Sequence, residues 1–215
     1  MRKTIVCFGD SNTYGYDPAT GKRYSEKIRW TARLQDILGD DYKVIEEGQN
    51  GRTIANADPA EWGTRCGMDY VLPMIESHMP VDLLIIMLGS NDLKDKFHLP
   101  APDIAGCLQN MVMRIKAYAA AQCGMPDMKI LLMSPPALRY PMHTSVFGPF
   151  YSDDACEKCQ KVGEWYALVA KQFDCAYLNV ASLITASEAD HLHLDPDGHK
   201  KLAELVAQQI QEMGI

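Results

Sequence analysis

Residues 5–13 read IVCFGDSNT, and the fold prediction starts from this stretch. The apolar run 5–8 predicts a buried strand, and the switch to Gly-Asp-Ser predicts that the strand ends in a polar turn. Open α/β sheets bind ligands at the carboxyl ends of their strands, where the strand order reverses. A first strand that ends at Ser11 therefore brings a hydroxyl to that edge. Because Gly-Asp-Ser is also ordinary turn composition, the interpretation depends on the other strand ends.

Further apolar runs alternate with segments of helical periodicity along the chain. The run 82–88 is apolar without alternation, which is typical of a central parallel strand covered on both faces. Strands are expected at 5–8, 42–45, 82–88, 129–133 and 176–180, and helices at 25–38, 70–78, 103–121, 153–173 and from Asp195-Pro196 onward. This order predicts an α/β fold with a five-stranded parallel sheet and helices on both faces. Since no repeat or linker interrupts the pattern, we expect a single domain over residues 1–215.

Composition and charge narrow the classes of partner. The 215 residues are 47% hydrophobic, which is enough for a sizeable core, and the formal net charge is −7. An acidic chain gains nothing from phosphate attraction, so we expect no nucleic acid partner. No lysine and arginine cluster indicates a membrane surface, and no apolar run reaches transmembrane length. Seven irregularly spaced cysteines and the lack of a cleavage signature predict reduced thiols and a cytoplasmic location.

Three of the expected strands end in small polar clusters. These are Gly-Asp-Ser-Asn at 9–12, Asn-Gly-Arg-Thr at 50–53 and Gly-Ser-Asn-Asp at 89–92. The carboxyl ends of parallel strands share one edge of a sheet. A fourth cluster, Asp-His-Leu-His-Leu-Asp at 190–195, falls between the last strand and the last helix. We therefore expect all four clusters to meet.

Together the clusters contain the groups that nucleophilic acyl chemistry requires. Ser11 offers a hydroxyl, and His193 offers an imidazole that can take its proton. Asp190, three residues earlier on a tight turn, can reach back to that imidazole. Asn91 offers a side-chain amide, and Gly51 an unobstructed backbone N–H, for a developing oxyanion. Asp10 and Asp92 are expected to satisfy backbone donors at the strand ends instead.

Two other kinds of site remain open from the residues alone. One is a non-catalytic flavodoxin-like module that binds a phosphate or nucleotide at helix N-termini, although the Gly-Asp-Ser-Asn turn makes a poor phosphate loop. The other is a metal site, for which the chain offers a dense group of ligand types. That group is His191, His193, Asp195, Asp197 and His199. Asp195 already has a helix-start role before Pro196, which argues against the metal site.

The four clusters resemble, in order, the conserved blocks of the SGNH (GDSL) hydrolases. The segments 46–53 and 85–92 and the sequence Ser134-Pro135-Pro136 are similar to the aryl esterase/perhydrolase (acyltransferase) branch in particular. This resemblance implies a flavodoxin-like three-layer α/β/α sandwich. It also implies hydrolysis of a small-molecule ester without a cofactor or metal.

The resemblance assigns roles to individual residues. Ser11 is the nucleophile, His193 the base and Asp190 its orienting partner. The oxyanion hole consists of the Ser11 N–H, the Gly51 N–H and the Asn91 side chain. Asn12 stands where the family name has leucine, and we expect this difference to affect substrate fit.

The resemblance leaves the substrate open. We expect small acyl or acetyl groups on aryl, alkyl or carbohydrate alcohols, with acyl transfer to an alcohol or peroxide as a side activity. A lysophospholipase or thioesterase of the same family is the alternative. The branch forms compact homo-oligomers, and the irregular segment 134–152 is the expected contact.

Overall fold

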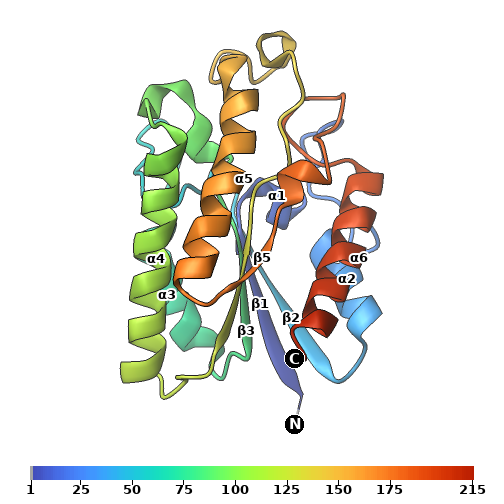
Figure 1. Ribbon diagram of the computed structural model, residues 1–215. Coiled ribbons are helices and arrows are strands. Elements are labelled where there is room, and N and C mark those ends of the chain that lie inside the picture. Colours follow the sequence, from blue (N-terminus) through green and yellow to red (C-terminus); the bar gives the residue numbers. More distant parts are fainter. Residues whose placement is uncertain (1) are drawn as a thin grey trace.

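The computed structural model describes residues 2–215, which form a central sheet between two layers of helices (Figure 1). The strands are β1 (Lys3–Gly9), β2 (Tyr42–Gly48), β3 (Leu83–Met87), β4 (Lys129–Met133) and β5 (Ala176–Leu178). They pair in the order β2-β1-β3-β4-β5, and every pair is parallel. The strand order reverses beside β1, which is the flavodoxin-like arrangement. The predicted three-layer α/β fold with five parallel strands is confirmed.

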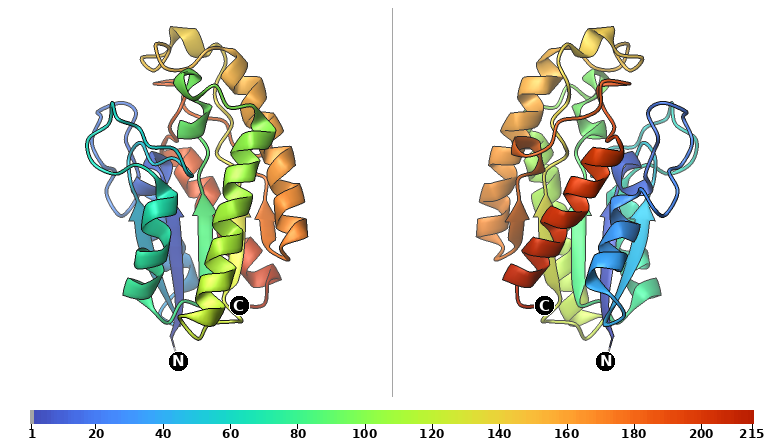
Figure 2. Two further views of the ribbon diagram at one scale, coloured as in Figure 1. Left: turned by 90° about the vertical axis from the view of Figure 1, so that its left-hand side faces the viewer. Right: turned by 90° about the vertical axis from the view of Figure 1, so that its right-hand side faces the viewer.

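Helices cover both faces of the sheet (Figure 2). One layer contains α3 (Gly67–His78), α4 (Ala101–Ala121) and α5 (Asp154–Gln172), and the other contains α2 (Trp30–Leu38) and α6 (Pro196–Glu212). Successive side chains of a strand point to opposite faces. In β1, Val6 and Phe8 accordingly pack in the α3–α5 core, while Ile5 and Cys7 pack in the α2–α6 core. Within residues 2–215, no helix has the length and apolarity needed to span a membrane.

Several helix boundaries differ from the sequence-based expectation. Helix α2 begins at Trp30 rather than at residue 25, because Arg29 has a non-helical ψ of 132°. The Arg29 guanidinium, which lies just before the helix, binds both carboxylate oxygens of the distant Glu46, at 3.0 and 2.8 Å. Helix α4 begins at Ala101 rather than at Asp103, since proline is accommodated in a first turn.

A one-turn helix that the sequence pattern did not predict, α1 (Ser11–Tyr14), follows β1 directly. The Asp10 side chain caps it by accepting a hydrogen bond from the Asn12 backbone N–H at 2.9 Å. This turn packs so closely on β2 that a Cβ at Gly48 would lie 2.1 Å from the backbone nitrogen of Tyr14. The close approach fixes Ser11 at the carboxyl edge of the sheet.

His199 joins the two helices of the second layer. It is fully buried on α6, and its Nδ1 accepts a hydrogen bond from the Trp30 backbone N–H of α2 at 3.3 Å. Burial lowers the pKa of His199 from 6.5 to about 4. The imidazole is therefore neutral in the folded protein, as expected for a packing histidine.

The protonation of His199 should make folding stability depend on pH. Between pH 6.5 and about pH 4 the unfolded chain binds a proton that the folded chain excludes, so stability falls as the pH falls. Urea unfolding at about pH 4.5 and about pH 6.5 measures this effect. As the pH rises from the lower to the higher value, the free energy of unfolding should increase by roughly 2 kcal/mol more in wild type than in His199→Gln. Equal gains in the two proteins would contradict this explanation.

Candidate active site

A continuous hydrogen-bond chain joins the end of β1 to the loop before α6. Ser11 Oγ lies 2.8 Å from His193 Nε2, and His193 Nδ1 lies 2.6 Å from Asp190 Oδ2. All three residues are buried, with exposed fractions of 6%, 3% and 1% in the order Ser11, His193, Asp190. A hydroxyl, an imidazole and a carboxylate in this order can generate an activated serine.

A tight turn holds the Asp190 carboxylate. His191 has a positive φ of 62°, which folds the chain back so that Asp190 Oδ1 accepts the backbone N–H groups of Leu192 and His193, at 3.0 and 2.8 Å. Burial alone would raise the pKa of Asp190, but the hydrogen bonds from His193 outweigh it and hold the pKa below its usual value. The carboxylate therefore stays charged beside the imidazole.

Two aromatic rings fix the imidazole from its other sides. The Tyr16 ring centroid lies 4.3 Å from that of His193, and the Phe147 ring meets it edge-on at 5.4 Å. Tyr16 follows α1, whereas Phe147 belongs to the long segment 134–152. Sequence spacing offered no reason to assign either residue to the histidine.

Asn12 holds the same loop through its side-chain amide. Its Oδ1 accepts the Leu194 N–H at 3.0 Å, and its Nδ2 donates to the Leu192 carbonyl at 3.4 Å. The amide therefore binds both neighbours of His193, which a leucine side chain cannot do. The sequence led us to expect an effect on substrate fit, but the contacts make Asn12 a positioning residue for the histidine.

A cavity of about 270 Å³ is lined by His193 and by the three residues that carry potential oxyanion donors. These donors are the backbone N–H groups of Ser11 and Gly51 and the side-chain amide of Asn91. Asn91 Nδ2 donates one hydrogen to the Arg52 carbonyl at 3.1 Å, which orients the amide and leaves its second hydrogen available. Gly51 has a φ of 77°, a conformation that glycine adopts readily. Within residues 2–215, the backbone N–H groups of Ser11 and Gly51 have no acceptor. The expected residues are thus together at the cavity.

The loop that carries Gly51 is anchored by the buried carboxyl group of Asp92. Asp92 accepts the Ile54 N–H at 3.1 Å and the Asn56 side chain at 3.0 Å. Burial raises the pKa of Asp92 to about 7, and the nearby Asp10 carboxylate acts in the same direction. Both aspartates therefore serve as scaffold at the strand ends, as their positions in the sequence indicated.

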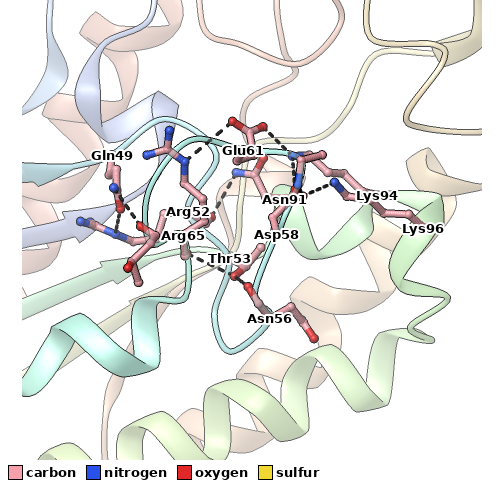
Figure 3. Close-up of polar contacts among 12 residues, drawn as sticks. Gln49, Arg52, Thr53, Asn56, Asp58, Glu61, Arg65, Asn91, Lys94 and Lys96 are labelled. Carbon is pink, nitrogen blue, oxygen red and sulfur yellow. Dashed lines mark hydrogen bonds and ion pairs between the residues drawn. The ribbon is translucent and has the colours of Figure 1, made fainter.

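Figure 3 shows an ionic cluster that sequence reasoning missed, of which Glu61, Lys94 and Lys96 line the cavity. The Asp58 side chain is fully buried and binds Lys96 and, at 3.1 Å, Lys94. Lys94 Nζ also lies 3.2 Å from Glu61 Oε1. Burial favours the neutral form of Asp58, but hydrogen bonds from Lys96 and Lys94 outweigh it and lower its pKa. Two lysines shortly after the Gly-Ser-Asn-Asp cluster were the only sequence signal for this ionic cluster.

The rest of the cavity wall is largely apolar. It is completed by Tyr16, Ala60, Phe147, Phe150, Tyr151 and Leu192, with Asn50 beside Gly51. Trp62 is 91% exposed and lies outside this lining, and Tyr14 and Asp17 also lie outside it. His143 pairs with Asp153 at 2.7 Å on the surface.

Three residues of the alternative metal site, His193, His199 and Asp195, have separate partners. Both ring nitrogens of His193 are engaged by Ser11 and Asp190, and His199 binds Trp30. Asp195 caps α6 by accepting the Gly198 N–H at 2.7 Å. In the part of the chain that the structure describes, no three His, Cys, Asp or Glu side chains are grouped closely enough to hold a metal ion. The geometry gives this alternative no support.

Known proteins match this chain in sequence and in fold. The profile of the GDSL-like lipase/acylhydrolase family matches residues 7–201. A carbohydrate acetylesterase family member from Sinorhizobium meliloti is 29% identical, with a TM-score of 0.91 over 99% of this chain and 100% of that one. The native aryl esterase of M. smegmatis is 31% identical, with a TM-score of 0.89 over 98% of this chain and 99% of that one.

A curated relative extends well beyond the matched region. The acetylxylan esterase of Xylanibacter ruminicola is 27% identical over 221 aligned positions, which cover 96% of this chain. They cover only 43% of that protein, so the chain spans less than half the length of this relative.

Replacement of Asn12 by leucine should displace the histidine. The Leu194 N–H and the Leu192 carbonyl would lose their partners in a buried setting, which costs about 1–3 kcal/mol of unfolding free energy. We expect Asn12→Leu to fold with this loss and to show a kcat on p-nitrophenyl acetate at least about tenfold lower, because the base is misplaced. A folded variant with wild-type kcat would contradict the positioning role.

Proposed function

The chain belongs to the GDSL-like lipase/acylhydrolase family, and we propose that it is a serine esterase that acts through an acyl-enzyme on Ser11. The observation that carries this proposal is the buried hydrogen-bond chain from Ser11 through His193 to Asp190, which opens into a cavity lined by Asn91 and Gly51. A non-catalytic ligand-binding module would have no need of this series of hydrogen bonds.

In the proposed first step, His193 Nε2 takes the proton of Ser11 as the Oγ attacks the ester carbonyl. Asp190 holds the imidazole in the tautomer that exposes Nε2 and stabilises its protonated form. The tetrahedral oxyanion accepts hydrogen bonds from the Ser11 and Gly51 N–H groups and from Asn91 Nδ2. His193 then gives the proton to the leaving alcohol, and the acyl group remains on Ser11.

In the second step, water attacks the acyl-enzyme and the proton transfers of the first step run in reverse. His193 removes a proton from water, the hydroxide attacks the acyl-enzyme, and the acid leaves as Ser11 regains its proton. An alcohol or a peroxide that enters the cavity can take the place of water, so acyl transfer is the proposed side activity.

Small acyl groups, and acetyl groups in particular, are the proposed substrates. The cavity of about 270 Å³ lies just below the usual range for small-molecule sites, which is about 300–1,000 Å³. The similar proteins are named as an acetylxylan esterase, a carbohydrate acetylesterase and an aryl esterase. We therefore favour acetyl esters of carbohydrate or aryl alcohols over the long acyl chains of a lysophospholipase.

We propose that residues 1–215 act as one domain in a homo-oligomer. Exposed apolar side chains near the cavity support such a contact: Val146 is 72% exposed and Phe150 is 50% exposed. Both belong to the segment 134–152 that the sequence suggested as the contact.

The seven cysteines are unpaired, which favours a reducing compartment such as the cytoplasm.

Matched substitutions at the nucleophile and at the oxyanion donor test the esterase. Hydrolysis of p-nitrophenyl acetate should fall to the background rate in Ser11→Ala, which loses only the attacking oxygen. Asn91→Ala should retain Ser11 but lose about 10²–10³-fold in kcat, because one donor to the oxyanion is missing. Wild-type kcat in Ser11→Ala would overturn the proposed function.

A further inference from the structure

We propose that Glu61 selects substrates by charge: its carboxylate occupies the place beside Lys94 that a negatively charged substrate group would otherwise take. The enzyme then favours esters without negative charge, and removal of the carboxylate opens the site to anionic ones. This inference rests on the proposed esterase and names the class of substrate that its cavity accepts.

Lys94 is the cation around which this part of the cavity is built. It is 7% exposed and lines the same cavity as Ser11 and His193. Its ammonium lies 3.1 Å from Asp58 Oδ2 and 3.2 Å from Glu61 Oε1. A buried ammonium requires such partners, so a carboxylate must stay beside it in the free enzyme.

The two carboxylates are not equally fixed. The Asp58 side chain is fully buried and binds both Lys94 and Lys96. The Glu61 side chain is 36% exposed, and apart from Lys94 its ionic partner is Arg65, whose Nε lies 3.7 Å from Glu61 Oε2. Because that distance exceeds hydrogen-bond length, Glu61 is the replaceable counterion of the pair.

The net charge of the wall depends on Glu61. Two cations, Lys94 and Lys96, face the two carboxylates of Asp58 and Glu61. With Glu61 in place these charges balance, and without it the surplus is one positive charge. The free ammonium donor of Lys94 would then bind a carboxylate supplied by the substrate.

Glu61 also lies next to the proposed oxyanion hole. Its carboxyl carbon and both oxygens lie 3.2–3.3 Å from the position that a Cβ would take on Gly51. A second negative charge from the substrate would meet Glu61 at short range in a partly enclosed cavity, where repulsion is stronger than in water. Neutral substrates avoid this repulsion, since Lys94 and Arg65 balance Glu61 itself.

Matched pairs of esters measure the selection. The first pair is p-nitrophenyl hydrogen succinate and its neutral methyl ester, which place the charge on the acyl side. The second pair is 4-acetoxybenzoate and its methyl ester, which place the charge on the alcohol side. The quantity compared is kcat/KM for the charged ester divided by kcat/KM for the neutral ester.

Wild type should disfavour the charged ester of at least one pair by about tenfold or more, and Glu61→Gln should raise that ratio by about tenfold. The additional substitution Lys94→Met in Glu61→Gln should return the ratio toward the wild-type value. Glu157→Gln removes the same charge from an exposed pair on α5, with Lys161 as its partner, and should leave the ratio unchanged.

The possible outcomes distinguish a failure of the proposed charge selection by Glu61 from a failure of the proposed esterase function. If neutral esters are hydrolysed but Glu61→Gln leaves both ratios as in wild type, the proposed role of Glu61 is overturned and the proposed esterase function stands. If wild type hydrolyses no ester of either pair, both are overturned. If wild type prefers the charged ester in each pair, the proposed role of Glu61 is overturned without the need for any variant. Thermal unfolding verifies that each variant is folded.

Discussion

The hydrogen bond between Ser11 Oγ and His193 Nε2 is the contact on which the site depends, and it joins residues 182 positions apart. Each side is fixed by a different part of the fold. Close packing of α1 on β2 holds Ser11, while the Asp190 turn and the Asn12 amide hold the loop on both sides of His193. The loop before α6 returns to the carboxyl end of β1, and this brings the two residues together.

The cavity combines an apolar wall with an ionic wall that is balanced internally. Tyr16 and Phe147 pack against the imidazole and keep water from it, which strengthens the electrostatic interactions of the site. On the ionic wall, Lys94 is neutralised by Asp58 and Glu61. A developing oxyanion would therefore meet oriented N–H donors rather than an unpaired charge, which is consistent with a site for neutral esters.

The sequence predicted those features that depend on local pattern. The unalternated run 82–88 is a central strand, and Asp195-Pro196 begins a helix, because burial and capping are local requirements. The proposed triad and oxyanion residues were identified from polar clusters after the strands and before the last helix. The start of α2, the Asn12 contacts and the Asp58–Lys94–Glu61 cluster could not be predicted in this way. Each depends on partners distant in sequence, such as Glu46 for Arg29 and Leu194 for Asn12.

Direct observation of the acyl-enzyme tests the central claim most sharply. Brief incubation with p-nitrophenyl acetate, acid quenching and mass spectrometry of the intact protein and its peptides would locate any covalent acyl group. We predict the mass increase of a single acetyl group, carried by the peptide that contains Ser11. An acetyl group on another residue, or turnover that leaves Ser11 unmodified even in Asn12→Leu or other slowed variants, would contradict the account.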